Sequence, residues 1–250
     1  MQGVVDTESA QEFMGEVLSK VPATELADIV MRLEVKRIFF QKLLNLEHLG
    51  QLTGEEIHQL LHSIFATRRN AASIMENCPP ENFRKLAAGL LHGTEKIDTR
   101  FQQFCQQFED LNLGKFAADL AGEMLHFTFP DRYWLWNRWM WDPIAKTGSL
   151  PLVVSEGFDL SGTTSGEMYM KVGKAVAFVH QTGEAAGFQK IAPTLFGTDV
   201  FLACVYVIYT YTVLRMRMTQ EFNKVIPGVV EFSQRLLGVN RMEEFEKTFA

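Results

Sequence analysis

Two groups of residues in this chain have the types and the spacing of metal ligands on a helix. Glu55 and His58 are three residues apart, and His62 follows four residues later. Glu123 and His126 repeat the three-residue spacing. Side chains three or four positions apart share one helix face, and di-iron bundles combine such Glu-x-x-His pairs with glutamates from other helices. The chemistry that follows is that of a metal-dependent helical enzyme.

A simpler interpretation of the same residues is preferred. Glu and His are common on helices, and no second set of inward-facing glutamates stands out elsewhere in the chain. His126 stands in the apolar run Met-Leu-His-Phe, where a core histidine satisfied by a hydrogen bond is expected. The metal site is therefore kept as a secondary hypothesis, and we expect no cofactor.

The stretch Ser-Gly-Thr-Thr-Ser-Gly at 161–166 invites comparison with a phosphate-binding loop. It lacks the lysine of the P-loop and the spacing of the dinucleotide fingerprint. Ser161, Ser165 and His180 do not form the Gly-x-Ser-x-Gly elbow of a hydrolase. The three cysteines, Cys78, Cys105 and Cys204, show no Cys-x-x-Cys spacing, and small buried hydrophobic residues are expected instead.

The residues from Phe127 to Pro143 stand out as a possible binding surface. All four tryptophans of the chain lie there, together with two arginines and a tyrosine. Arg, Trp and Tyr are the residues that dominate protein interfaces, and they also form base-stacking surfaces in proteins that bind single strands. On a helix the four indoles would point to two opposite faces, which one chain does not easily cover. The predicted partner-binding residues are Arg132, Tyr133, Trp134, Trp136, Arg138, Trp139 and Trp141.

A buried hub for converging helices is the alternative reading of the same stretch. A core position would place the rings inside the chain and pair Arg132 with an acid. The sequence alone leaves both possibilities open.

Composition indicates a globular protein whose partner is not recognised by overall charge. The 250 residues are 47% hydrophobic and 22% charged, and the formal net charge is −6. This charge argues against a whole-surface electrostatic grip on nucleic acid, although a local basic patch such as Arg68 and Arg69 remains compatible with it. Sparse cysteines and an N-terminus without a secretion signal predict a cytoplasmic protein.

Helical periodicity runs through most of the chain and must position these residues. Amphipathic patterns predict helices over 1–20, 24–50, 53–65, 83–93, 94–111, 116–127 and 165–182, with Thr53 and Glu56 as a capping box and Thr94 as a cap. A further short helix is expected to end at Cys78, before two prolines. Residues 146–164 are rich in Gly, Ser and Thr and predict one long loop. The apolar run 200–214 predicts a buried core helix and not a membrane span, because about 22 Å of helix does not cross a bilayer. A strand is the alternative for this run. A further loop is expected at 183–198 and a final helix pair at 220–237 and 241–249.

Several segments resemble a known helical module. Leu125–Asn137 reads Leu-His-Phe-x-Phe-Pro-Asp-Arg-Tyr-x-Leu-Trp-Asn, and it is followed by Gly166–Tyr169 and Asp199–Tyr206 and preceded by Ile97–Phe101. In this order the segments are similar to a module that accompanies prokaryotic restriction and defence proteins of the McrB type. The resemblance covers about residues 94–210. It implies a helical architecture and work inside a larger assembly.

The chain also departs from that pattern. The stretch 138–143 carries large residues where such modules have smaller ones, and Ala203 and Cys204 replace an aromatic pair. There is no Walker motif and no nuclease motif, so the resemblance implies that any such activity belongs to a partner.

We therefore predict a mostly α-helical, multi-helix globular protein with one long Gly/Ser/Thr-rich loop. The expected regions are 1–93 and 94–250, the second containing the segment 127–143. The expected function is that of a non-catalytic binding or accessory subunit that contacts another protein or its own copy. A nucleic-acid-associated module of a prokaryotic defence system is the alternative, and no membrane span is expected.

Overall fold

The computed structural model describes residues 4–186, 195–217 and 228–242. Within these ranges the chain forms α-helices, two short 3₁₀ turns and two isolated β-bridges, but no sheet. The prediction of a mostly α-helical, multi-helix fold is confirmed. The expected loop at 183–198 and the expected helices at 220–237 and 241–249 lie partly outside the described residues.

The helices follow one another with short connections as far as residue 128. They are α1 (Thr7–Lys20), α2 (Ala23–Leu44), α3 (Leu46–Leu49), α4 (Gly54–His62), α5 (Ala71–Asn77), α6 (Pro80–His92), α7 (Ile97–Asp110), α8 (Gly114–Thr128), α9 (Ser165–Ala186), α10 (Leu195–Arg217) and α11 (Val229–Leu236), with 3₁₀ turns η1 (Arg68–Asn70) and η2 (Leu150–Leu152). A proline sets one of the helix boundaries. Pro80 is the first residue of α6, a position that needs no backbone N–H donor.

The start of α4 is the predicted capping box. The backbone N–H of Glu56 donates to the Thr53 hydroxyl oxygen over 3.2 Å, and the Thr53 N–H donates to the Glu56 carboxylate over 2.8 Å. The cap predicted at Thr94 is wrong. Helix α7 begins at Ile97 after Lys96, which makes no side-chain capping bond.

The Trp-rich segment, Phe127–Pro143, is not helical beyond Thr128. Helix α8 ends at Thr128, and the N–H groups of Arg132 and Tyr133 turn back onto the Phe129 carbonyl. Pro130 explains the break, because proline disfavours helix at the residue before it and cannot donate to the ladder. The argument from two opposite helix faces therefore does not apply to this segment. The long loop begins at residue 129 rather than at 146 and continues to Thr164.

Two compact units are built from interleaved parts of the chain. The first comprises Met1–Leu33, Trp139–Phe158 and Ala175–Asn240, and the second comprises Glu34–Arg138, Asp159–Lys174 and Arg241–Ala250. This division differs from the expected one at residue 93. The reason is that α6 and α7, which flank that residue, pack against each other within the second unit.

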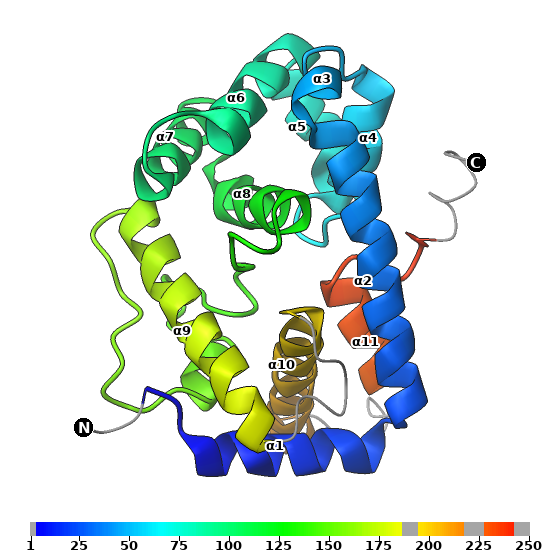
Figure 1. Ribbon diagram of the computed structural model, residues 1–250, viewed down its shortest axis with the longest axis vertical. Helices are drawn as coiled ribbons and strands as arrows, with labels where there is room; N and C mark the ends of the chain where they lie inside the picture. Colours follow the sequence, from blue (N-terminus) through cyan, green and yellow to red (C-terminus); the bar gives the residue numbers. More distant parts are fainter. Residues whose placement is uncertain (1–3, 187–194, 218–227, 243–250) are drawn as a thin grey trace. The chain divides into compact units, whose positions relative to one another are not determined.

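In the second unit, α8 packs against two neighbouring helices. Helices α6 and α7 both pack against α8, and α3 packs against α6 (Figure 1). Helix α4 packs against α5 and η1. The buried faces of these helices carry the phenylalanines and leucines that the sequence periodicity places on one side.

In the first unit, α10 packs against α1 and α11 (Figure 1). The run 200–214 lies within α10, so it is a helix and not a strand. Residues Leu195–Leu214 are long and apolar enough to cross a membrane by length and composition alone, and 61% of that window is buried within the fold.

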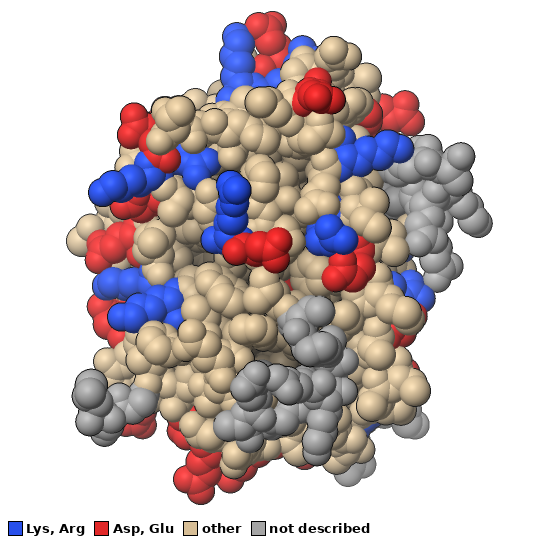
Figure 2. Space-filling model, in the orientation of Figure 1, with Lys and Arg blue, Asp and Glu red and all other residues tan. Residues whose placement is uncertain are grey.

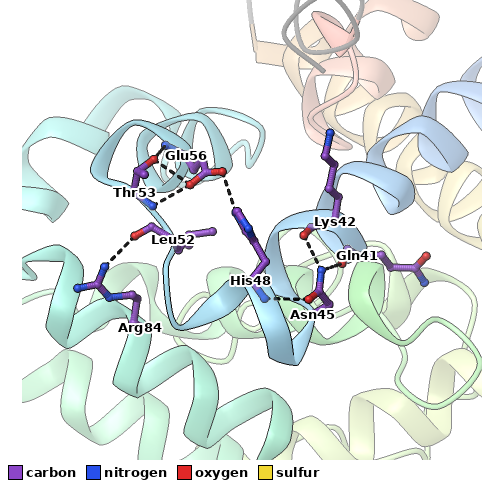
Figure 3. Close-up of polar contacts among 8 residues, drawn as sticks. All are labelled: Gln41, Lys42, Asn45, His48, Leu52, Thr53, Glu56 and Arg84. Carbon is purple, nitrogen blue, oxygen red and sulfur yellow. Dashed lines mark hydrogen bonds and ion pairs between the residues drawn. The ribbon is translucent and has the colours of Figure 1, made fainter. Parts of the chain in front are cut away.

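A single asparagine joins α2 to α3 in the second unit. The Asn45 side-chain amide donates to the carbonyls of Gln41 and Lys42 at the end of α2. Its Oδ1 accepts from the N–H of Glu47 over 3.0 Å and from the N–H of His48 over 2.9 Å, at the start of α3. Figure 3 shows the contact with His48. Asn45 thus hydrogen-bonds to backbone groups at the end of α2 and at the start of α3, positions where a helix leaves such groups without a partner of its own.

Figure 3 also shows the neighbouring contact that ties α3 to α4. The His48 Nε2 atom lies 2.8 Å from a carboxylate oxygen of Glu56, the capping-box residue. Burial opposes ionisation of Glu56. Hydrogen bonds from Thr53 and His48 outweigh it, so the pKa of Glu56 lies below its usual value.

We expect Asn45→Ala to lower the free energy of unfolding by about 1 kcal/mol, because both helix ends lose their partners. Asn45→Asp keeps the acceptor for α3 and loses the donors for α2, so it should fall between the wild type and Asn45→Ala. Urea denaturation followed by circular dichroism measures both. An Asn45→Asp variant as stable as the wild type would show that the contacts to α2 contribute nothing.

Candidate functional site

One face of α8 carries polar and small residues that hold the Trp-rich segment. Asp119, Gly122, Glu123 and His126 follow the spacing i, i+3, i+4 and i+7, so they lie along one stripe of the helix. We call these four residues the α8 stripe. All four are buried. Each meets a different residue of the segment 133–138, so the segment's position is fixed at four successive points.

At the centre of the stripe is a buried ion pair. The Lys36 Nζ atom lies 2.6 Å from Glu123 Oε2, and the two side chains are 0% and 1% exposed. The ammonium group also lies 4.5 Å from the centre of the Phe127 ring, as in a cation–π contact. Burial raises the pKa of Glu123 above its usual value, although Lys36 and Asn137 act in the opposite direction.

The two carboxylates of the stripe each bind a residue at the end of the segment. The Asn137 amide donates to Glu123 Oε1 over 3.0 Å. The backbone N–H of Arg138 donates to Asp119 Oδ1 over 2.9 Å, and its guanidinium donates to Oδ2 over 2.6 Å. Arg138, a predicted partner contact, is thus bound to Asp119.

The remaining two stripe residues contact the backbone of the segment. His126 Nδ1 lies 2.8 Å from the Tyr133 carbonyl oxygen, which can only accept, so this nitrogen carries the proton. Gly122 lies so close to the segment that an added β-carbon would be 2.2 Å from the Trp136 carbonyl oxygen. Only glycine leaves room for this approach.

An aromatic stack supports the segment from its other side. The Phe101 ring stacks on Tyr169 at 4.3 Å and on Trp136 at 5.5 Å between ring centroids. The Tyr169 hydroxyl donates to the Trp134 carbonyl over 3.2 Å. Arg100 donates to the Tyr133 hydroxyl over 2.8 Å. Residues from three of the segments singled out in the sequence, 97–101, 125–137 and 166–169, therefore meet in one place.

The seven predicted partner-binding residues divide into an enclosed and an accessible set. Trp136, Trp139 and Trp141 are 1%, 6% and 7% exposed, so these indoles lie inside the fold and offer no surface. Trp139 belongs to the first unit, where its ring lies 6.4 Å from that of Tyr206. Tyr133, Trp134 and Arg138 are half-buried, and Arg132 is exposed.

The accessible part of the segment runs from residue 129 to residue 134, and we call it the open end. Phe129 and Tyr133 contact edge to face at 6.1 Å between ring centroids. The Arg132 guanidinium lies 5.8 Å from the centre of the Phe129 ring. Phe129, Tyr133 and Trp134 are all half-buried, so the open end presents aromatic surface around an exposed arginine.

The predicted metal ligands remain in two separate groups. Glu123 is bound to Lys36 and Asn137, and His126 is bound to Tyr133. His58 and His62 lie with ring centroids 4.4 Å apart on α4. Among the described residues, no group of three or more His, Cys, Asp or Glu side chains could hold a metal ion.

In the glycine-rich loop, backbone N–H groups of the kind that bind a phosphate donate to carboxylates of the same chain. Glu167 accepts from the Thr163 N–H over 2.8 Å, and Asp159 accepts from the Ser161 N–H over 2.8 Å. Lys171 pairs with both carboxylates at 3.0 and 3.2 Å. The Ser161 N–H and Lys171 lower the pKa of Asp159 to about 2, so this arrangement is fully charged at neutral pH.

The cysteines are buried and poorly suited to nucleophilic chemistry. Burial raises the pKa of the Cys78 and Cys204 thiols to about 11 and that of Cys105 to about 12. Very little thiolate is present at neutral pH, and the thiolate is the reactive form.

Sequence reasoning missed Lys36, Asp119 and Gly122. Lys36 interrupts the apolar face of α2 between Leu33 and Phe40, and a lysine at such a position indicates a buried acidic partner. Gly122 interrupts the apolar pattern of α8, which indicates a close approach. Asp119 gave no recognisable signal.

No family model matches this chain, and no curated protein or solved structure matches it either.

We expect Gly122→Ala to lower the free energy of unfolding by about 2 kcal/mol or more, because the new methyl group displaces the Trp136 backbone. Gly89→Ala is the matched control. Gly89 is an exposed residue within α6 whose added β-carbon meets nothing within 4 Å, so this variant should be about 0.5–1 kcal/mol more stable than the wild type. Equal effects of the two substitutions in thermal unfolding would contradict the close contact.

Lys36→Met should lower the free energy of unfolding by about 3–5 kcal/mol at neutral pH, because Glu123 is left charged and buried. Without Lys36, burial raises the pKa of Glu123 further. The native state then holds a proton more tightly than the unfolded chain, so the loss should shrink as the pH falls towards about 4.3.

The double variant Lys36→Met/Glu123→Gln keeps an acceptor for Asn137 and removes the unpaired charge. It should be more stable than Lys36→Met at neutral pH. Denaturant titrations across the pH range measure both variants, and a pH-independent loss in Lys36→Met would argue against a buried charge as its cause.

Proposed function

We propose that this protein is a non-catalytic binding subunit that contacts another protein through the open end of the Trp-rich segment, residues 129–134. The observation that carries the proposal is the contrast within that segment. Asn137 and Arg138 are fixed to α8 by hydrogen bonds to carboxylates, while Phe129, Arg132, Tyr133 and Trp134 keep accessible surface.

Rigidity of this kind favours binding. A segment that is already ordered loses little conformational entropy when a partner docks on it. The Tyr133 carbonyl is held by His126 and its hydroxyl by Arg100, so the ring is oriented before any encounter. Tyr, Trp and Arg are the residue types that contribute most of the binding energy at protein interfaces.

The charge distribution supports a protein partner over nucleic acid. On the face drawn in Figure 2, basic and acidic side chains are interspersed and do not gather into one extended basic surface. Arg138, which the nucleic-acid hypothesis would use, is bound to Asp119. A polyanion gains affinity from many cations acting together, whereas the open end offers aromatic area with Arg132.

The resemblance to modules that accompany restriction and defence proteins agrees with this proposal. A module without a catalytic motif that works inside an assembly needs a preformed contact surface. The proposed partner is then the component that carries the enzymatic activity.

The decisive experiment places a photocrosslinking amino acid at position 132 of the full-length protein. Cells of the native host that produce this variant are then irradiated with ultraviolet light. We expect one specific protein to be captured from position 132 and not from position 85, an exposed lysine on α6 in the same unit. Arg132→Ala/Trp134→Ala should then weaken binding of that purified protein by about thirtyfold or more, which corresponds to about 2 kcal/mol.

Lys85→Ala is the matched control and should bind as the wild type does, with unchanged circular dichroism in both variants. Sedimentation of the purified protein at increasing concentration tests the alternative that the partner is a second copy of the chain. If Arg132→Ala/Trp134→Ala binds the captured protein as tightly as Lys85→Ala does, the open end is not the interface.

A further inference from the structure

Two imidazole rings lie next to each other on the surface of α4. His58 is exposed and His62 is half-buried, and their ring centroids are 4.4 Å apart. Within the part of the chain that the structure describes, neither ring forms a hydrogen bond or an ion pair with another residue. Histidines four residues apart lie on one helix face, and such pairs recur in proteins as ligands of divalent metal ions.

Helix α4 holds these two side chains on a fixed backbone. The capping box of Thr53 and Glu56 closes the first turn of the helix. Ile57, Leu60 and Leu61 are buried and attach the inner face of the helix to the rest of the unit. Because the backbone is already ordered, a metal ion that binds both imidazoles orders only two side chains.

The separation of the two rings fits one particular coordination angle. A metal–nitrogen bond of about 2.0–2.1 Å places the centre of each ligating ring roughly 3.2 Å from the ion. Two such ring centres are about 4.5 Å apart when the angle at the ion is a right angle, and about 5.2 Å apart when the angle is tetrahedral. The observed 4.4 Å agrees with the right angle. Tetragonal Cu²⁺ and Ni²⁺ prefer that angle, whereas Zn²⁺ prefers the tetrahedral one.

Positive charge near the two rings opposes the binding of a cation. Partial burial lowers the pKa of His62, and the positive charges of His58, Arg68 and Arg241 lower it further. The two arginines also repel a metal ion. The ion must therefore have a high affinity for nitrogen ligands, and Cu²⁺ has the highest among the divalent metals of the first transition row.

We propose that His58 and His62 chelate a divalent transition-metal ion, with Cu²⁺ bound most tightly. The two imidazole nitrogens take neighbouring positions at the ion, and water fills the others. This site uses two protein ligands, so it needs no larger group of ligating side chains, and among the described residues there is none. It is independent of the proposed protein interface.

Isothermal titration of the full-length protein with copper, nickel and zinc chloride tests the proposal. We expect saturable binding whose affinity decreases from Cu²⁺ to Ni²⁺ to Zn²⁺. His58→Gln and His62→Gln should each weaken Cu²⁺ binding by about tenfold or more, because the second ligand is no longer supplied by the same helix face. His58 is exposed, so His58→Gln should leave the fold unchanged.

The matched control exchanges two residues of α4, as Gln59→His/His62→Gln. This variant keeps the composition, the net charge and the number of histidines, but its two imidazoles point about 100° apart around the helix. It should bind Cu²⁺ as weakly as His62→Gln does. In electron paramagnetic resonance, Cu²⁺ bound to the wild type should show coupling to two imidazole nitrogens, and Cu²⁺ bound to the exchange variant should not.

Two results would overturn the proposal. One is the absence of saturable Cu²⁺ binding by the wild type, and the other is an exchange variant that binds Cu²⁺ as tightly as the wild type. Tighter binding of Zn²⁺ than of Cu²⁺ and Ni²⁺ would contradict the right-angle arrangement.

Discussion

The second unit depends on a charge pair that has been removed from water. Lys36 and Glu123 are fully enclosed, and a buried pair of this kind is stable only when every polar atom near it is satisfied. Glu123 has two partners from different parts of the chain: its Oε2 pairs with Lys36 of α2, and its Oε1 accepts from Asn137 of the Trp-rich segment. The pair therefore links α2, α8 and the segment, and none of the three can shift without exposing or orphaning a charge.

This constraint gives the Trp-rich segment two different ends. In residues 136–138, Asp119 accepts from the Arg138 backbone N–H, Glu123 accepts from the Asn137 side chain, and Gly122 leaves room for the Trp136 carbonyl. The indoles of Trp136, Trp139 and Trp141 are buried. From 129 to 134 the segment is anchored through its backbone and through the Tyr133 hydroxyl, while aromatic surface remains accessible. A partly exposed aromatic surface on a fixed backbone favours recognition, because a surface that is already ordered loses less conformational entropy when a partner binds.

The two Glu-x-x-His groups show how environment decides the role of one spacing. On α8 both residues face inward and are held by the chain's own lysine, asparagine and carbonyl groups. On α4, His58 is exposed and His62 is half-buried, and their ring centroids are 4.4 Å apart. Equal spacing thus leads to a buried structural contact in one place and to an accessible pair of imidazoles in the other.

The sequence by itself determined the helical class, most helix positions and the Thr53–Glu56 cap, because these follow from local periodicity and local hydrogen bonds. Lys36 and Gly122 interrupt apolar patterns, yet their partners Glu123 and Trp136 are distant in the sequence, and local rules do not pair them. Only the tertiary structure decided that the segment turns back along α8 and that three of four indoles are enclosed. The physical reason is that burial of a charge and approach to a glycine depend on which distant segments meet.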